Sequence, residues 1–453
     1  MPYGPHTPDD RARMRAALGI ASIDELFEDI PLAVRAPGLD LPGPLTELEL
    51  SFRLRALAGR NRIDLASFLG AGVYRHYVPA AVDQIASRGE FYTAYTPYQP
   101  EISQGTLQTI YEYQSMLAEL TALDAVSASH YDGATATAEA ALMCLRATGR
   151  ARILVSAGVH PEYLATTRTY LDGSRFGLET VPLRADGTTD LAALERLLAD
   201  ASAPVAGVLV AQPNVFGILE PMAEATRLAH AAGALLVAVV EPVSLAVLAP
   251  PGAYGADIAA GEGQPLGLPL GYGGPYLGIL AATSALMRQL PGRLVGRTTD
   301  ADGRRAFVMT LRAREQDIRR ERAASNICTN QALCALAATV YLATIGPHGL
   351  RDAAALGAAR ARELERALAA AGAPRVHAGP YLNEFAVHVS DAPRVHAALL
   401  ERGILAGLPL ATWFPDDPVL RDALLVCATE VTQTAEIEAF AAALRDVRTE
   451  VVA

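Results

Sequence analysis

The stretch VAGVLVAQPNVFGILEPMAEATRLAHAAGALLVAVV, residues 205–240, decides the fold class. It opens with an apolar run, Val205–Ala211, that predicts a buried strand, and it closes with a second such run, Ala234–Val240. Between them, Pro221–Ala232 has the pattern of a helix, with proline at its first position and Gly233 just past its end. Continuous apolar strands are covered on both faces, so this strand–helix–strand unit predicts a parallel sheet between layers of helices.

The same alternation of helices and strands extends along the chain on both sides of this unit. In such α/β sheets the sites lie at the carboxyl ends of the strands, so residues that follow a strand are the first candidates for function. The further predicted elements are a helix at 132–145, a strand Arg152–Ser156, a helix from Pro161, a strand near Leu178–Leu183, a helix Asp190–Ala201 and a strand Tyr276–Ala282.

The two ends of the chain have different patterns from this middle part. Near the N-terminus, Thr7 is a helix cap, and a proline-rich stretch from Ile30 to Pro44 predicts an extended linker. Towards the C-terminus the apolar spacing is helical, interrupted by one strand pattern at Asn383–Val389. We therefore predict an arm and linker at 1–65, a large α/β domain at 66–325 and a small α+β domain at 326–453.

Composition excludes several classes of function. The formal net charge of −11 argues against binding to nucleic acid or to an anionic membrane surface. No apolar run reaches the ~20 residues that a membrane span needs. The four cysteines are far apart in the sequence and form no CxxC pair, which favours a reducing compartment, and we expect the cytoplasm. The nine histidines show no metal-binding spacing.

All 38 basic side chains are arginines, so the printed sequence contains no lysine. An enzyme that holds pyridoxal phosphate as an imine needs a lysine amine to form that bond. This chain alone is therefore not a conventional Schiff-base enzyme.

The densest candidate segment is FYTAYTPYQPEISQ, residues 91–104. Its prolines fix the backbone, and its rings supply rigid walls with polar tips. Such a loop suits either an active-site wall or an ordinary packing interface.

Three further segments follow strands or open helices. Gly133, Ala134 and Thr135 begin a predicted helix, where free N–H groups favour an anion, although a capped helix start has the same pattern. Glu241 follows the second buried strand, and Gln264 lies in a glycine-rich loop after another strand pattern.

Arg312–Gln331 concentrates five arginines, which suits either an anion site or the solvated face of a helix with Glu315 and Glu321 as partners.

Six strings in these segments closely resemble the P-protein family of the glycine cleavage system, the glycine dehydrogenases (decarboxylating). The resemblance covers nearly the whole chain and points to the N-terminal half of that enzyme, which in some organisms is a separate subunit 1, or alpha subunit. The strings are TAYTPYQPEISQG (93–105), YDGATATAEA (131–140), HPEY (160–163), PPGAYGADIAAGEGQPLGLPLGYGGP (250–275), RQLPGRLVG (288–296) and RAASNICTNQAL (322–333).

The resemblance implies fold type I of the pyridoxal-phosphate-dependent transferases. It implies that a partner beta subunit carries the pyridoxal lysine, that glycine is decarboxylated there, and that the aminomethyl group passes to the lipoyl arm of the H-protein. Across the interface, this chain would contribute four side chains to that site: Tyr95, Tyr98, Glu101 and Gln104.

The family's own pyridoxal position would survive in this chain only as a vestigial pseudo-site. His130, Gly133, Ala134, Thr135, Glu241 and Gln264 would mark it. Gln264 would stand near the place of the lysine, and Glu241 where an aspartate is expected, with an extra methylene that would crowd a pyridine ring. Two alternatives remain open: a non-catalytic subunit whose pseudo-site binds an anion or small regulator, and an independent enzyme with another cofactor.

Overall fold

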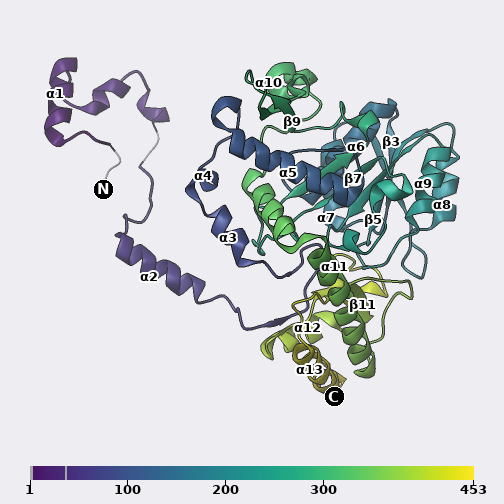
Figure 1. Ribbon diagram of the computed structural model, residues 1–453. Coiled ribbons are helices and arrows are strands. Elements are labelled where there is room, and N and C mark those ends of the chain that lie inside the picture. The colour runs from purple at the N-terminus through teal and green to yellow at the C-terminus, as the bar shows by residue number, and fades with distance from the viewer. Residues whose placement is uncertain (1–3, 36–37, 453) are drawn as a thin grey trace. The chain divides into compact units, whose positions relative to one another are not determined.

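The structure is a computed structural model that describes residues 4–35 and 38–452 (Figure 1). Contacts divide the chain into two compact units, Met1–Ile63 and Asp64–Ala453. The division of the second unit at residue 326 stays a prediction. The first unit contains α1 (Pro8–Leu18) and α2 (Glu47–Ala58) with two short 3₁₀ turns, Ile23–Phe27 and Leu32–Val34.

Thr7 caps α1 as its sequence predicts. Its side chain accepts from the backbone of Asp10, whose carboxylate accepts from the backbone of Thr7 in return. Ala36 and Pro37 of the predicted extended linker lie outside the described residues.

A seven-stranded mixed sheet forms the centre of the second unit, in the order β2-β8-β7-β6-β5-β3-β4. The strands from β3 to β7 are parallel to one another, and β8 runs antiparallel to both β7 and β2. The bounds are β2 (Ala125–Val126), β3 (Arg152–Ser156), β4 (Gly177–Val181), β5 (Val205–Gln212), β6 (Leu235–Val240), β7 (Ile258–Glu262) and β8 (Gly278–Ala282).

Helices cover both faces of this sheet, as the apolar strands require. Along β6, Val237 and Val239 pack in the core beneath α6, whereas Leu236 and Ala238 pack on the opposite face beneath α9. Gly207 of β5 lets α6 approach closely, because a Cβ there would lie 2.6 Å from the Cys144 sulfur. The covering helices are α5 (Gln104–Thr121), α6 (Gly133–Thr148), α7 (Pro161–Leu171), α8 (Leu191–Leu198), α9 (Met222–Ala231) and the first part of α11 (Ala332–Ala370).

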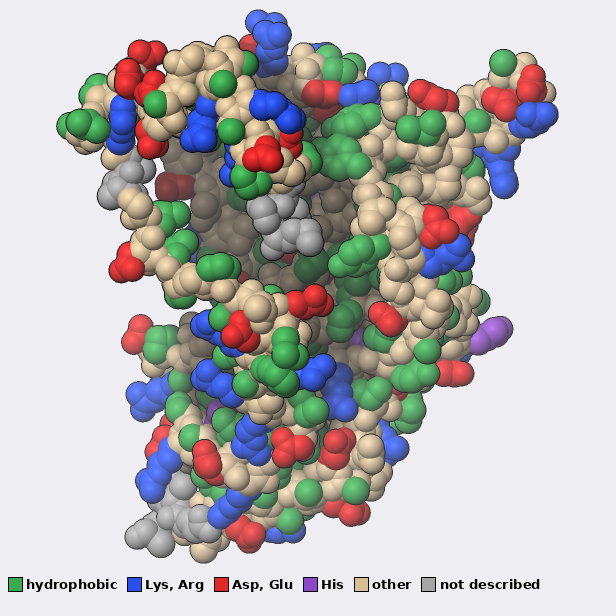
Figure 2. All heavy atoms as spheres, turned by 90° about the vertical axis from the view of Figure 1, so that its left-hand side faces the viewer, with side chains coloured by type: hydrophobic (Ala, Val, Ile, Leu, Met, Phe, Trp, Pro, Cys, Tyr) green, Lys and Arg blue, Asp and Glu red, His purple; other side chains and the backbone are tan. Residues whose placement is uncertain are grey.

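The C-terminal part packs β11, α12 and α13 around a core of its own (Figure 1). The strand β11 (Glu384–His388) pairs antiparallel with β14 (Ala423–Cys427), which also pairs with β13 (Leu408–Pro409). A separate two-residue pair joins β1 (Ala66–Ser67) to β12 (Ile404–Leu405). The helices are α12 (Ala392–Glu401) and α13 (Thr434–Val452). Figure 2 shows basic and acidic side chains interspersed over this part of the chain on the face it presents.

The expectation that no segment is long and apolar enough for a membrane span is corrected by helix α11, which by length and composition could cross a membrane. Half of its most apolar window is buried inside the structure, which is typical of a core helix. Its helical geometry is broken at Gly346, immediately before Pro347.

The arginine-rich segment Arg312–Gln331 is not the continuous helix that one interpretation required. It consists of a 3₁₀ turn Arg312–Arg314, α10 (Gln316–Arg319) and a second turn at Arg320–Arg322. Leu311 and Arg320 have φ of 54° and 51°, values that interrupt a right-handed helix. Arg312 pairs with Asp317 at 2.5 Å, and of the two predicted glutamates only Glu321 forms an ion pair among the described residues, with Arg322 at 3.8 Å.

Two further short helices, α3 (Ala80–Ala86) and α4 (Gly89–Tyr92), lead to the aromatic segment, which ends in a 3₁₀ turn at Pro100–Ile102 before α5. An antiparallel hairpin of β9 (Leu294–Thr299) and β10 (Arg305–Thr310) lies against α5. Sequence patterns did not predict this hairpin.

Candidate functional site

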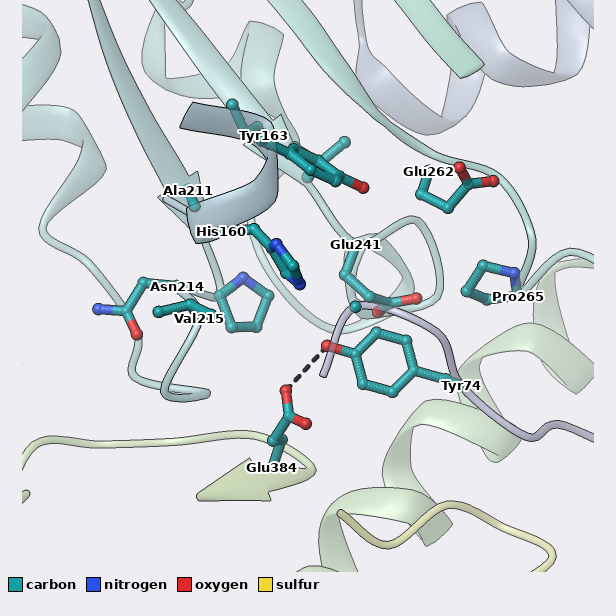
Figure 3. Close-up of a pocket in the computed structure, with 14 residues that line it drawn as sticks. Tyr74, His160, Tyr163, Ala211, Asn214, Val215, Glu241, Glu262, Pro265 and Glu384 are labelled. Carbon is teal, nitrogen blue, oxygen red and sulfur yellow. Dashed lines mark hydrogen bonds between the residues drawn. The ribbon is translucent and has the colours of Figure 1, made fainter. Parts of the chain in front are cut away.

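A small cavity of about 60 Å³ lies at the carboxyl edge of the sheet, where the fold class predicts a site (Figure 3). Glu241 directly follows β6, Glu262 ends β7, and Asn214 lies just beyond β5. The topology therefore gathers onto one edge residues that are far apart in the sequence. Gly72, Tyr74, His160, Tyr163, Val215, Pro265 and Glu384 complete most of the lining.

The carboxyl groups of Glu384 and Glu241 both line this cavity. Glu384 of β11 accepts hydrogen bonds from the Tyr74 hydroxyl at 2.9 Å and from the backbone N–H of Ala71 at 2.6 Å. Glu241 accepts from the backbone of Val243 and Ser244, at 2.9 and 2.6 Å, and so caps the turn that follows it. Burial raises the pKa of Glu384 to about 7 and raises that of Glu241 as well. Both carboxylates thus serve the protein's own backbone.

Glu262 occupies the N-terminus of α6, the place where an anion would be expected. Its Oε2 accepts from the backbone N–H of Gly133 at 2.9 Å, and its Oε1 accepts from those of Gln264 and Leu277, each at 2.9 Å. Burial raises its pKa to about 7, against the opposing effect of these three donors. In Figure 3 its carboxyl group points away from those of Glu241 and Glu384.

The remaining donors at the start of α6 are also largely satisfied. The Asp132 side chain accepts from the N–H of Thr135 at 2.8 Å, and its carbonyl accepts from that of Ala136 at 3.0 Å. With Gly133 bound to Glu262, Ala134 is the one of the first four residues whose N–H has no acceptor among the described residues. The helix start is therefore already neutralised by protein carboxylates.

Gln264 acts as a clamp on the backbone of Tyr74. Its side-chain oxygen accepts from the Tyr74 N–H at 2.9 Å, while its side-chain nitrogen donates to the Tyr74 carbonyl at 2.9 Å and to that of Leu268 at 2.8 Å. The side chain is buried, and its neighbour Pro265 lines the cavity. It makes all three bonds near the place where the resemblance puts the pyridoxal lysine.

Pyridoxal phosphate does not fit the pseudo-site of this chain. Glu262 fills the place of the phosphate, Gln264 offers no amine for an imine, and Glu241 is turned to its own backbone. His130 does not line the cavity, and its buried ring lies beside the backbone of Pro291. Burial lowers the pKa of His130 to about 4, so the ring is neutral at physiological pH.

The predicted aromatic loop has a fixed base and an exposed tip. Tyr95 is 84% exposed and Tyr98 is 45% exposed, and Glu101 is also exposed. Gln104, in contrast, is partly buried, and its side chain accepts from the Phe307 N–H at 2.9 Å while donating to the Phe307 carbonyl at 2.9 Å. Gln104 therefore fastens the loop to β10. Tyr95 and Glu101 are presented outward, whereas the half-exposed Tyr98 turns its hydroxyl to the buried Arg293.

A second cavity, of about 180 Å³, lies beneath this loop. One wall is formed by the aromatic segment, including Tyr92 and Tyr95, and the other by residues from Thr329 to Leu336, including Asn330. Two of the family-like strings, 93–105 and 322–333, thus meet at one cavity. The structure separates this place from the closed pseudo-site, which has a different set of lining residues.

Sequence reasoning missed several residues of both places. Glu384, Tyr74 and Glu262 carry the hydrogen bonds of the pseudo-site, and Arg293 and Asn330 hold the loop. Arg293 and Asn330 lie inside the family-like strings 288–296 and 322–333, but nothing in the sequence singled them out within those strings, because their partners lie far away in the chain. Tyr74 and Glu384 had no usable signal for the same reason. Glu262 had one, since an acidic residue at the end of a predicted strand belongs to the edge where sites occur.

The sequence of the chain is similar to one protein family along almost its whole length. The family model described as glycine cleavage system P-protein matches residues 1–444. A probable glycine dehydrogenase (decarboxylating) subunit 1 of Moorella thermoacetica is 53% identical over 450 residues, covering 99% of this chain and 100% of that protein. Another, of Anaeromyxobacter dehalogenans, is 50% identical over 447 residues, covering 98% of this chain and all of that protein.

Comparison with solved structures leads to the same family. A crystal structure of glycine decarboxylase (P-protein) of the glycine cleavage system, in inhibitor-bound form, has a TM-score of 0.90 and 46% identity, and covers 99% of this chain and 100% of that chain. A sphingosine-1-phosphate lyase of Burkholderia pseudomallei, at TM-score 0.65 and 17% identity over 93% of this chain and 95% of its own, shares the fold alone. The predicted fold type I of pyridoxal-phosphate-dependent transferases is confirmed. So is the resemblance seen in the six strings: the chain belongs to the glycine cleavage system P-protein family.

Proposed function

We propose that this chain acts as the alpha subunit, subunit 1, of a glycine dehydrogenase (decarboxylating). With a lysine-bearing beta subunit it would decarboxylate glycine and pass the aminomethyl group to the lipoyl arm of the H-protein. The family membership and the full-length similarity to proteins named subunit 1 support this proposal. The chemistry of decarboxylation belongs to pyridoxal phosphate, which we place on the beta subunit.

The observation that carries this proposal is the closed pseudo-site. Its anion position is filled by Glu262 and the neighbourhood of its lysine position by Gln264, so this chain cannot hold the cofactor in the family's manner. The same closure counts against an anion-regulated subunit, because Gly133 and Thr135 have already given their N–H groups to carboxylates. The active site must then be completed by another chain.

The contribution of this chain to that site is its aromatic loop. Tyr95 presents its phenol ring outward and Glu101 presents a carboxylate, from a loop that Gln104 fixes at its base. Tyr98 exposes part of its ring, while its hydroxyl is turned inward to Arg293. Rigid rings exclude water, and polar groups on their rim orient a small amino acid without moving themselves. We therefore assign binding and orientation to these side chains, and loop anchoring to Gln104.

Co-expression with a lysine-bearing partner tests the proposal. The complex should bind pyridoxal phosphate and exchange bicarbonate carbon into glycine, whereas the isolated chain should do neither. Tyr95→Ala and Glu101→Gln should lower the exchange without loss of assembly, as judged by gel filtration. Glu438→Gln, an exposed glutamate of α13, is the matched control and should change neither.

Two results would contradict the proposal. Pyridoxal phosphate held by the isolated chain would overturn the assignment of the cofactor to the partner. Full exchange activity in both loop variants would remove the loop from the active site. We further propose a cytoplasmic location, which is supported by the four cysteines being free thiols.

A further inference from the structure

We propose that Arg293 is a positioning residue for the reaction, because it holds the two walls of the cavity beneath the aromatic loop at a fixed separation. This proposal rests on the proposed function, in which that loop completes the partner's active site. Arg293 immediately precedes β9 and is only 5% exposed. It therefore acts through its neighbours and not through contact with a substrate.

The guanidinium of Arg293 joins three points of the chain. It donates to the Tyr98 hydroxyl at 3.2 Å, to the Asn330 side-chain oxygen at 2.8 Å and to the Cys328 carbonyl at 2.6 Å. Tyr98 belongs to the aromatic loop, whereas Cys328 and Asn330 belong to the opposite segment. A planar fork with donors in fixed directions can hold three such acceptors at once.

The ring of Tyr98 is also held by its face. The guanidinium carbons of Arg293 and Arg312 lie 5.6 and 5.5 Å from its centroid, within the range of cation–π attraction. Arg312 is itself fixed by an ion pair with Asp317. The Tyr95 ring lies next to that of Tyr98, with centroids 6.4 Å apart, so an anchored Tyr98 also limits where Tyr95 can lie.

Asn330 passes the same constraint to the sheet. Its side-chain nitrogen lies 3.4 Å from the Ala128 carbonyl and 3.3 Å from the Ser129 hydroxyl, and its carboxamide oxygen faces Arg293. The Arg293 carbonyl in turn accepts from the Ala128 N–H at 2.8 Å. Because Ala128 and Ser129 follow the end of β2 by two and three residues, these bonds attach the walls of the cavity to the sheet.

The charge environment explains why this residue is an arginine with a structural task. Among the described residues no carboxylate lies within ion-pair distance of Arg293: Glu315, whose pKa burial raises and the Arg293 charge lowers in part, attracts it only from farther away, and the three acceptors that Arg293 serves are neutral. Burying an unpaired cation is costly, so a position that needed packing alone would take an apolar side chain. The fork geometry is what the site gains from the guanidinium.

Hydrogen exchange of the full chain tests this directly. In Arg293→Gln and Arg293→Lys, backbone amides of residues 91–104 and 326–333 should exchange about tenfold faster or more, while those of β5 and β6 keep wild-type rates. Arg297→Gln, at an exposed arginine of β9, the strand that Arg293 precedes, is the matched control and should exchange as wild type does. Tyr98→Phe, which removes only the hydroxyl acceptor, should give a smaller increase and serves if Arg293→Gln fails to fold.

The complex with the beta subunit supplies the second measurement. Arg293→Gln should lower kcat/KM for glycine by about 10- to 100-fold, mainly through kcat, with unchanged assembly. Wild-type amide hydrogen-exchange rates in both Arg293 variants would overturn the proposal. Faster amide hydrogen exchange together with undiminished glycine turnover would also overturn it. If the wild-type complex itself has no glycine activity, or if Tyr95→Ala leaves it unchanged, it is the proposed function that fails, and the exchange result still reports on Arg293 alone.

Discussion

Replacing Glu262 by alanine tests whether a carboxylate of the chain itself fills the anion position of the fold. The substitution leaves three buried N–H donors, those of Gly133, Gln264 and Leu277, without their acceptor. At about 1 kcal/mol for each donor, the lower end because water can enter from the adjoining cavity, the free energy of unfolding should fall by about 3 kcal/mol at pH 8. Glu195→Ala, at an exposed glutamate of α8, should change it by less than about 0.5 kcal/mol.

The decrease in the free energy of unfolding caused by Glu262→Ala should be larger at low pH. The folded-state pKa of Glu262 is about 7, above its ordinary value of 4.5. The folded protein therefore binds the proton more tightly, and the resulting stability is complete below pH 4.5 and is lost as the pH rises through 7. With these two values the wild type is stabilised by about 2.5 kcal/mol more at pH 5 than at pH 8. Glu262→Ala lacks this contribution, so its deficit should be about 2.5 kcal/mol greater at pH 5.

Urea unfolding followed by circular dichroism at both pH values measures these differences. Inorganic phosphate adds a second observation, because the vacated helix start should now accept an oxyanion. Phosphate should raise the unfolding midpoint of Glu262→Ala and leave that of the wild type unchanged. If Glu262→Ala unfolds like Glu195→Ala at both pH values, the reasoning about the filled anion position is refuted.

Three more predictions concern the same edge of the sheet. Glu384→Gln should flatten the fall in stability between pH 4.5 and 7, because its folded pKa of about 7 makes the wild type lose stability there; an unchanged slope in pH-dependent urea unfolding would contradict this. Gln264→Ala should cost about 2–3 kcal/mol and speed amide exchange around Tyr74, whose backbone it clamps on both sides. Gly217→Ala should cost more than about 2 kcal/mol, because φ is 73° and a Cβ would lie 1.8 Å from the Glu384 carbonyl oxygen. Gly303→Ala, at a similar φ in open space, should cost about 1 kcal/mol in the same urea assay.

The local elements could be predicted from the sequence because their signals are local. The strand Arg152–Ser156 has the predicted bounds, and the capped helix start at Gly133 and the helix after Pro161 lie where the pattern puts them. The hairpin of β9 and β10 was missed, because only the first two residues of β9 are buried and its pattern does not alternate clearly. Boundaries shifted where a turn competed with a helix, as at Leu198, three residues before the predicted end.

The candidate site was less predictable, because hydrogen bonds between distant segments decide the role of each residue. Gln264 and Glu241 were correctly placed near the strand ends, yet the sequence does not show that they serve the chain's own backbone. Gln104 has the residue type of a catalytic amide, but its partner Phe307 is about 200 positions away and makes it an anchor. The roles of Tyr95 and Tyr98 stay predictions, with exposure and anchoring as their support.

The groups that close the pseudo-site also join the sheet to the C-terminal part of the chain. The segment from Ala71 to Tyr77 is bound from the sheet side by Gln264, and by Glu384 and Glu430 from the other side, with Glu430 accepting from the Tyr77 N–H at 2.7 Å. In an enzyme that binds its cofactor at this edge, such contacts would compete with the ligand for the same donors. Under the proposed function no cofactor binds at this edge, so these bonds would be free of such competition and the edge would act as a rigid joint.

A rigid joint suits a subunit whose contribution lies elsewhere. The aromatic loop leads into α5, and α5 packs on α11, the helix that runs from the sheet into the C-terminal part. If the joint moved as a ligand came and went, Tyr95 would move with the elements that carry its loop, and orientation of glycine in the partner's site would suffer. Loosening the joint with Gln264→Ala should therefore lower turnover of the complex, although Gln264 touches neither substrate nor cofactor. Undiminished turnover, measured as bicarbonate exchange in a variant whose amides near Tyr74 demonstrably exchange faster, would show that the closed pseudo-site and the presented loop are independent.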